Sequence, residues 1–257
     1  MARNKKDRVE ALLKEFGRTY SEEIGIRLAN SPAPLFQLLV ASILYSARIG
    51  SQIATQAAKE LFDAGYRTPR AMAGSTWKKR VQVLNRAGYA RYQERTSTML
   101  GDVAEHLNER WGGDLRKLRD EAERDPGRER ALLKEFKGIG DAGVDIFFRE
   151  VQAVWDEVAP YADRRALQAA RRLDLGDAAS DLARLTDRKS YPRLVAALVR
   201  VHQDDLFDRV DPGPADGDGA EAGATKRELY ERARRLDIPG RSRMTKEELA
   251  EAVAGRS

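Results

Sequence analysis

Apolar residues recur at intervals of three and four along most of the chain, and no segment alternates convincingly between apolar and polar residues. The first spacing marks one face of an α-helix, whereas alternation would mark a strand. The most apolar segment, Pro34 to Leu44, follows Ser31-Pro32-Ala33, and proline is common at a helix start. The spacing predicts an all-α fold, with helices over residues 9–16, 34–44, 51–62, 69–73, 76–86, 92–111, 115–123, 128–136, 142–151, 163–173, 178–185 and 191–207 in the main part of the chain.

The charge composition suits a nucleic-acid partner. The chain has 46 basic side chains against 41 acidic ones, a net charge of +5, and a pI near 9.4. A heavily charged helical protein without such a partner would show the same balance. The absence of cysteine excludes disulfides, thiolate zinc sites, cysteine-ligated iron–sulfur clusters and cysteine nucleophiles. Only His106 and His202 remain as histidine ligands, so we expect no metal site.

The sequence shows no sign of membrane insertion or export. No apolar run approaches the roughly 20 residues that span a bilayer. No apolar signal core follows the basic segment from Met1 to Arg8. We expect a monomer in the cytoplasm, associated with the nucleoid.

A change of composition near residue 210 predicts the domain boundaries. Residues 211–224 are rich in glycine, proline and alanine and carry only acidic charge, which is typical of a flexible linker. Residues 225–257 then predict a small module with helices over 226–236 and 246–253. Thr225 with Glu228, and Thr245 with Glu248, have the spacing of a capping box. We therefore expect a main domain at 1–210, a linker at 211–224 and a module at 225–257.

A glycine-rich turn between two predicted helices is a candidate phosphate site. Gly138 and Gly140 flank one apolar residue, and glycine lets the backbone turn tightly and approach a ligand closely. The next helix begins near Asp141, so its free N–H groups and positive dipole end face the turn and attract phosphate. Lys137, Gly138, Gly140 and Gly143 are the DNA-binding candidates here. An alternative is a plain turn, which the same pattern often forms.

Four segments, in order, resemble the helix-hairpin-helix DNA glycosylase superfamily, nearest in layout to endonuclease III and MutY. They are Leu38 to Arg48, Ala87 to Tyr92, Phe136 to Gly140, and Ala162 to Arg165. The resemblance covers residues 34–207 and implies a two-lobed fold that binds double-stranded DNA. It also implies a monovalent cation on the carbonyls of the hairpin.

The chain departs from this family at three places. Ala142 stands where bifunctional members have a lysine, whose amine would form the Schiff base that leads to strand cleavage. Lys137 replaces the usual hairpin proline, and the cysteines of an iron–sulfur cluster are absent. We therefore expect no cluster and no other cofactor, and the resemblance puts strand cleavage in doubt.

The resemblance assigns roles to residues outside the hairpin. Asp163 would stabilise the positive charge that builds on the sugar as the glycosidic bond breaks, and would orient or deprotonate a water. Its alternative role is an N-cap, which aspartate also favours. Arg48 would fill the gap left by an extruded base, or else contact phosphate. Tyr45 and Tyr161 would line the base pocket, or else pack in the core.

The C-terminal module resembles small Rho N-terminal-like or SAP-like helical modules. The likeness lies in Leu229-Tyr230, the segment from Leu236 to Met244, and Glu248-Leu249. Such modules bind nucleic acid, so Lys226, Arg241, Arg243 and Lys246 are candidates for sequence-independent phosphate contact. The alternative is a solvated basic face.

These observations predict a monofunctional DNA glycosylase of base-excision repair, which hydrolyses the N-glycosidic bond of a damaged or modified base. One alternative is a helix-hairpin-helix protein that binds DNA without turnover. Another is an abasic-site lyase that uses an amine such as that of Lys137. The sequence does not identify the base, because pocket shape decides it.

Overall fold

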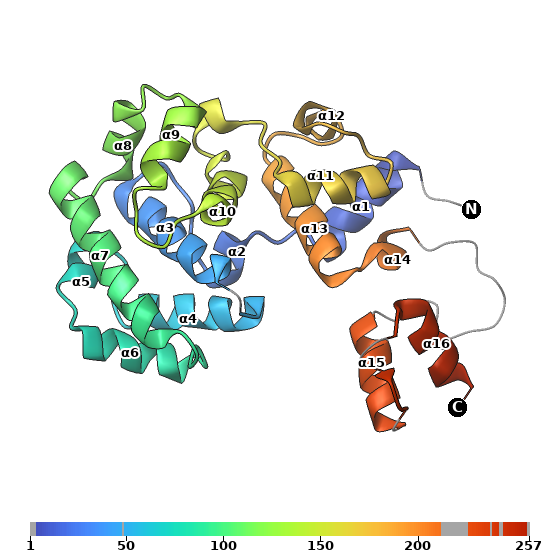
Figure 1. The fold of residues 1–257 in the computed structure, drawn as a ribbon. Helices are drawn as coiled ribbons and strands as arrows, with labels where there is room; N and C mark the ends of the chain where they lie inside the picture. Colours follow the sequence, from blue (N-terminus) through green and yellow to red (C-terminus); the bar gives the residue numbers. More distant parts are fainter. Residues whose placement is uncertain (1–3, 48, 212–225, 237, 242–243, 256–257) are drawn as a thin grey trace. The chain divides into compact units, whose positions relative to one another are not determined.

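The computed structural model describes residues 4–47, 49–211, 226–236, 238–241 and 244–255. Every regular element in those ranges is a helix and none is a strand, so the predicted all-α class is confirmed (Figure 1). The chain forms two compact units. One runs from Arg18 to Asp163, and the other, here called the terminal unit, combines Met1–Gly17 with Arg164–Ser257.

Helix α3 (Pro32–Ser46) forms the centre of the Arg18–Asp163 unit. Its residues from Leu38 to Leu44 are all buried, because α3 packs against α4 (Ser51–Asp63) and α10 (Asp141–Val151). A helix that is apolar on all sides is stable only when its neighbours cover it. The predicted helix at 34–44 is therefore confirmed, with two more residues at each end.

Six further helices complete this unit. They are α2 (Tyr20–Ile24), α5 (Pro69–Ala73), α6 (Trp77–Arg86), α7 (Gln93–Trp111), α8 (Leu115–Glu121) and α9 (Pro126–Leu133), with a short 3₁₀ turn at Asp156–Val158. The prediction missed α2 and the 3₁₀ turn. Buried Arg80 joins α5, α6 and α7 by donating to the carbonyls of Met72, Ser75 and Ser97 at 3.2, 2.7 and 3.0 Å. Arg80 thereby fixes α7, which lines the site described below.

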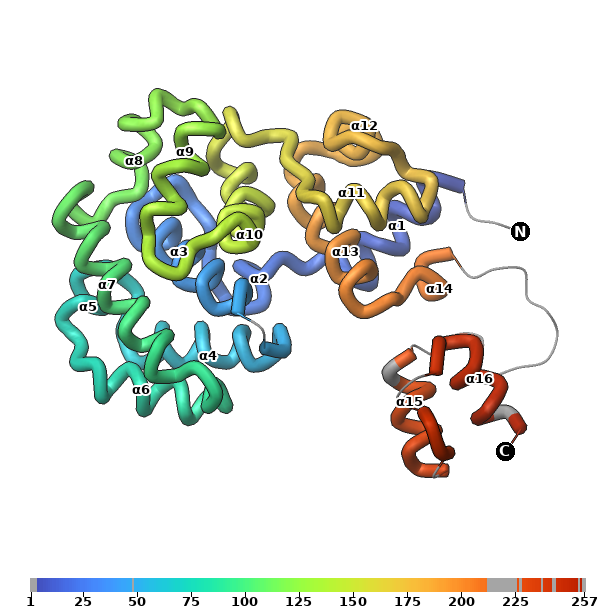
Figure 2. The backbone as a smooth tube through the Cα atoms, in the orientation of Figure 1, coloured from blue at the N-terminus to red at the C-terminus, as the bar shows by residue number. Residues whose placement is uncertain are grey.

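The terminal unit packs α13 (Tyr191–Asp204) against α11 (Arg164–Arg172) and α1 (Lys5–Glu15) (Figures 1 and 2). It also contains α12 (Ala179–Ala183) and α14 (Phe207–Val210). The single helix predicted over 191–207 is wrong. Asp205 takes a left-handed conformation with φ of 50°, which ends α13, and the chain begins α14 two residues later.

The C-terminal module has α15 (Lys226–Arg235) and α16 (Lys246–Ala254) around its own apolar cluster, which consists of Leu229, Ala233, Ile238, Leu249 and Val253. The capping box of Thr245 and Glu248 is confirmed. Thr225 and residues 212–224 lie outside the described residues, so the linker remains a prediction. Contacts group the module with the terminal unit, and the predicted boundary at 210 is untested.

Candidate nucleic-acid interface and buried carboxylate

Two buried apolar side chains anchor the hairpin between α9 and α10. The N–H of Phe136 donates to the carbonyl of Leu133 at 3.3 Å, and the N–H of Ile139 donates to the carbonyl of Phe136 at 3.0 Å. Both side chains lie in the core of the unit. The turn is thus held from inside, and its glycines face outward on either side of Ile139.

The structural requirement for glycine differs among the three positions of the hairpin. Gly138 has φ of +92°, and a Cβ there would lie 2.8 Å from the sulfur of Met99. A Cβ on Gly143 would lie 3.2 Å from Ile139, so this helix turn packs closely on the hairpin. Gly140 is the N-cap of α10, has an ordinary extended backbone, and would place a Cβ in open space. The fold therefore needs glycine at 138 but not at 140.

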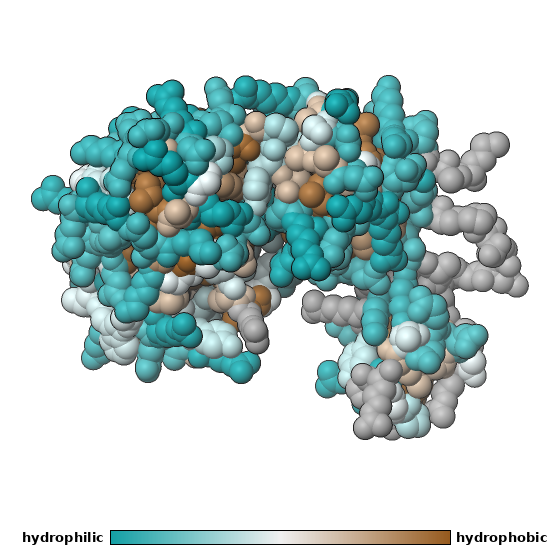
Figure 3. Space-filling model, turned by 45° about the horizontal axis from the view of Figure 1, so that its top comes forward, coloured by the Kyte–Doolittle hydropathy of each residue, from teal (hydrophilic) through white to brown (hydrophobic). Residues whose placement is uncertain are grey.

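Acidic side chains contact the basic side chains around the hairpin. Lys137 Nζ lies 2.6 Å from Asp102, and Lys134 Nζ lies 2.9 Å from Asp141, which Arg130 also reaches at 3.3 Å. The hydrogen bond from Lys134 lowers the pKa of Asp141. These pairs are exposed, and exposed ion pairs contribute little stability, so another anion can displace them. Hydrophilic side chains also cover most of the face drawn in Figure 3.

Asp163 is buried in an ion pair. Its Oδ2 lies 2.7 Å from Nε of Arg149, and the two side chains are 4% and 7% exposed. Asp163 directly precedes α11, as the sequence predicted, while Arg149 comes from the last turn of α10. A buried carboxylate needs such an opposite charge. Ala142 lies in the first turn of α10.

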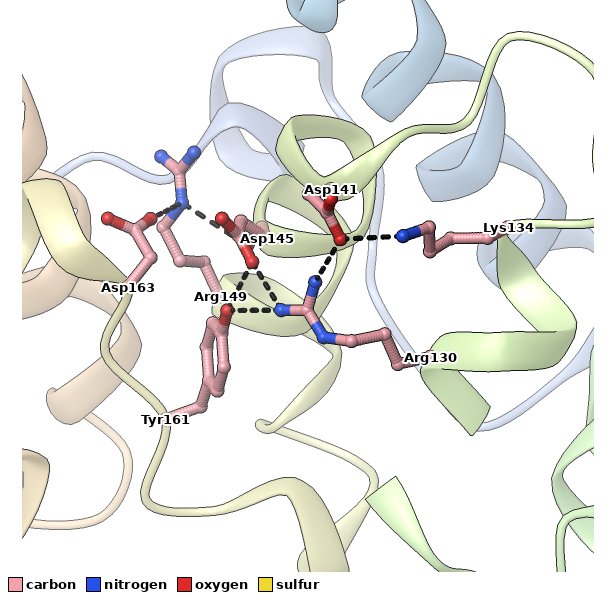
Figure 4. A network of polar contacts seen from close by, with 7 residues as sticks. All are labelled: Arg130, Lys134, Asp141, Asp145, Arg149, Tyr161 and Asp163. Carbon is pink, nitrogen blue, oxygen red and sulfur yellow. Dashed lines mark hydrogen bonds and ion pairs between the residues drawn. The ribbon is translucent and has the colours of Figure 1, made fainter. Parts of the chain in front are cut away.

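A polar network joins the loop before Asp163 to α9 and α10 (Figure 4). The hydroxyl of Tyr161 donates to Asp145 at 2.5 Å and lies 3.0 Å from Arg130, which also pairs with Asp145. Burial, followed by the Asp145 contact, raises the pKa of Tyr161. Asp145 itself is half-buried between Arg130 and Tyr161.

Gln152 fixes the backbone of the same loop. Its side chain accepts from the N–H of Tyr161 at 2.8 Å and donates to the Tyr161 carbonyl at 3.0 Å. The sequence did not predict these roles for Gln152 and Arg149. Arg149 could have been found from the sequence, because it is a charged residue that follows Phe147-Phe148 on a strongly apolar helix. Gln152 could not have been found in this way, because its contacts depend on tertiary structure.

The other predicted site residues lie apart from this network or outside the described residues. The Tyr45 ring stacks on Tyr20 with centroids 3.8 Å apart, and its hydroxyl lies 2.6 Å from that of Thr55. Lys226 and Lys246 begin α15 and α16, and Arg241 donates to the carbonyl of Ile238 at 2.9 Å. Arg48 and Arg243 lie outside the described residues.

A cavity of about 280 Å³ opens beside the hairpin, between the end of α3 and the start of α7. Gly138 and Arg95 are among the residues that line it, and Asp163, Tyr45 and Tyr161 are not. In the described ranges, no group of three or more His, Asp or Glu side chains is arranged to hold a metal ion. No helix in those ranges has the length and apolar composition needed to cross a membrane.

Comparison with known proteins gives one distant structural likeness. The chain is similar to endonuclease III in a trapped covalent intermediate with DNA, described as an estranged-adenine complex. The identity is 17% and the TM-score 0.47, over 75% of this chain and 82% of the other. No protein-family model matches the sequence, and no curated protein matches it.

Proposed function

We propose that this protein binds double-stranded DNA through the hairpin at Gly138–Gly140. The observation that carries this proposal is the open space at Gly140, directly before an eleven-residue helix with no side-chain cap. The first N–H groups of a helix have no partners within it, and they attract a phosphate oxygen that can come close. Gly140 leaves that approach free of side-chain atoms.

The surrounding charges support this proposal in part. Lys134, Lys137 and Arg130 lie around the turn, and their exposed pairs with Asp141 and Asp102 are weak enough to exchange for phosphate. Asp141 opposes binding because its carboxylate is at the helix start. Together, these charges predict a modest affinity for DNA that depends strongly on salt concentration.

The substitution Gly140→Val tests hairpin binding. Valine fits the extended backbone and meets no neighbour, so the helical fold should persist while the side chain blocks phosphate. We expect affinity for a fluorescein-labelled duplex to fall by about tenfold, as measured by anisotropy, because a charge-assisted hydrogen bond no longer forms.

Ser31→Val provides the matched control. Ser31 is the N-cap of α3, has an extended backbone and makes no capping hydrogen bond. It lies at the opposite end of α3 from the cavity beside the hairpin. Unchanged affinity in Gly140→Val, with circular dichroism equal to that of the unsubstituted protein, would refute the proposal.

A second candidate function is hydrolysis of the N-glycosidic bond of a damaged or modified base, in base-excision repair. The observation that favours it is the buried Asp163 carboxylate, held by Arg149 on the helix that starts at the hairpin. A carboxylate near the sugar would stabilise the oxocarbenium-like state and help water attack. With Ala142 in place of a lysine, water rather than an amine would be the nucleophile.

A panel of lesion-containing duplexes tests this candidate. After incubation, alkali converts abasic sites to strand breaks, which are resolved on a denaturing gel. We expect breaks with one class of lesion and none with Asp163→Asn, which should bind DNA as the unsubstituted protein does. If no lesion yields abasic sites, the protein binds DNA without base excision. Asp145→Asn is the control, because it also alters a carboxylate of the network. If it retains activity, the loss in Asp163→Asn is a loss of chemistry and not of the fold.

A further inference from the structure

The turn of the hairpin rests on the thioether of Met99, which comes from α7. A Cβ on Gly138 would lie 2.8 Å from the sulfur of Met99 and 3.1 Å from its methyl carbon. The thioether therefore occupies the space that a side chain at residue 138 would need. Because glycine has no Cβ, the backbone of the turn packs directly on this sulfur.

A second contact ties the hairpin to the same helix. Lys137 Nζ lies 2.6 Å from Asp102, which follows Met99 by three residues on α7, so both residues are on one face of the helix. This ion pair is exposed and contributes little stability. Of the two contacts, the packing of Gly138 on Met99 therefore sets how closely the turn approaches α7.

Met99 is open to small solutes. It is half-buried, and it lines the cavity of about 280 Å³ beside the hairpin. A water molecule takes up about 30 Å³ in the liquid, so a molecule as small as hydrogen peroxide can enter this cavity. The chain has no cysteine, which leaves methionine as the side chain whose sulfur a peroxide oxidises. Met72 is fully buried, Met244 is half-buried in the C-terminal module, and Met1 lies outside the described residues.

We propose that Met99 is an oxidation site through which a peroxide controls DNA binding by the hairpin. The sulfur attacks one oxygen of hydrogen peroxide, the O–O bond breaks, and the products are methionine sulfoxide and water. The sulfur is oxidised and the peroxide is reduced, so no further reactant is needed. The inference rests on the proposed DNA binding, because Gly138 belongs to the hairpin that would hold the phosphate.

The sulfoxide does not fit beneath the turn. Oxidation adds an oxygen atom and turns an apolar group into a polar one at a point of close packing. Helix α7 has little freedom to yield, because Arg80 holds it to α5 and α6. Phe136 and Ile139 are anchored in the core, so the displacement falls on Lys137 and Gly138. The turn then loses the shape that would receive a phosphate.

Treatment of the full chain with hydrogen peroxide tests this inference. Peptide mapping by mass spectrometry should find one added oxygen on Met99 and none on Met72. We expect anisotropy with the fluorescein-labelled duplex to show an affinity lower by up to about tenfold, because a charge-assisted hydrogen bond at the hairpin is lost. The circular dichroism should stay that of the untreated protein, since the anchors of the hairpin remain in the core.

Met99→Leu and Met244→Leu are the matched variants. Leucine has nearly the volume of methionine and no sulfur, so both variants should fold and should bind the duplex normally before treatment. After treatment, Met99→Leu should keep its affinity, whereas Met244→Leu should lose affinity as the unsubstituted protein does. Met99→Gln, which has a polar group at a similar length, should bind more weakly without any peroxide.

Four results would overturn this role of Met99. They are a Met99 that stays reduced, an oxidised Met99 with unchanged affinity, a Met99→Leu variant that loses as much affinity as the unsubstituted protein, and a Met99→Gln variant that binds fully. If the untreated, unsubstituted protein does not bind the duplex, the proposed function itself fails.

Discussion

At the scale of single residues, the clearest anomaly is a pair of neighbouring carboxyl groups, one of which is fully buried. Glu129 on α9 is fully buried, and Glu157 beside it takes two hydrogen bonds from Arg119, at 2.5 and 2.6 Å. Burial, followed by the neighbouring Glu157, raises the pKa of Glu129 to about 8. Burial also acts to raise the pKa of Glu157, but Arg119 outweighs it and brings that pKa to about 2. Glu129 is thus the protonated member at neutral pH.

This pair predicts a loss of stability at alkaline pH. Because the folded-state pKa of Glu129 is above its ordinary value, its contribution is complete below the unfolded pKa and is lost as pH rises through about 8. Urea unfolding between pH 6 and 9.5 should show the free energy falling by up to about 1 kcal/mol per pH unit from pH 6 to about 8, and levelling off above that. Glu129→Gln should flatten this slope, whereas exposed Glu105→Gln should not. An equal slope in all three proteins would show that Glu129 does not titrate there.

Asp141 gives a second prediction at this scale. Its carboxylate is at the start of α10 and engages Lys134 and Arg130. Asp141→Asn should strengthen binding to duplex DNA by about fivefold at low salt, since it removes a repulsive charge and releases two cations. Asp63→Asn, an exposed acid paired with Arg67, should change little. Weaker binding by Asp141→Asn would mean that phosphate does not approach the hairpin.

At the scale of elements, the sequence predicted the long helices and the hairpin because their signals are local. Periodicity found α3, α4 and α7, and Gly138 and Gly140 revealed the turn. The elements that were missed depend on distant partners. Helix α2 has five residues, and the buried carboxylate of Glu150 accepts from the N–H groups of Tyr20 and Ser21 at 2.6 and 2.9 Å.

The same distinction between local signals and distant partners applies to the candidate site. Asp163 and its place before α11 followed from the order of the motifs, and its role stays a prediction. Its pairing with Arg149 did not follow, because the partner is set by how the loop folds over α10. The stacking of Tyr45 on Tyr20 likewise joins two residues that only the fold brings together.

The contact of Glu150 with α2 predicts an effect on stability. Burial raises the pKa of Glu150, although the hydrogen bonds from Ser21 and Tyr20 oppose the shift. Glu150→Gln replaces one acceptor oxygen with an amide donor facing an N–H group. We expect the free energy of unfolding to fall by about 1–3 kcal/mol in urea denaturation. Exposed Glu109→Gln should lie within about 0.5 kcal/mol of the unsubstituted protein; a similar value for Glu150→Gln would show that α2 does not depend on this carboxylate.

At the scale of the whole molecule, the sequence predicts a second basic surface on the C-terminal module. Lys226 and Lys246 begin its two helices, and the cluster around Leu229 and Leu249 gives it a small core of its own. We propose that this surface binds phosphates independently of sequence, in addition to the phosphate at the hairpin.

Removing the residues after Val210 should therefore weaken DNA affinity. The slope of log affinity against log salt should fall by about one unit for each phosphate that the module neutralises. Anisotropy titrations at several salt concentrations measure both quantities. The same titrations on Gly140→Val in the full chain separate the two surfaces, since that variant should still bind phosphate through the module. An unchanged affinity and slope after truncation would assign all binding to the rest of the chain.

The terminal unit combines the first helix of the chain with helices that follow Arg164. Helix α1 buries Val9 and Leu12, and it packs against α13. During synthesis, α1 therefore leaves the ribosome long before its partner exists. Its apolar face must wait in solvent, or bound to a chaperone, while the entire Arg18–Asp163 unit emerges. That unit is able to complete its own core first, and the order of translation separates the synthesis of α1 from its packing by the whole length of that unit.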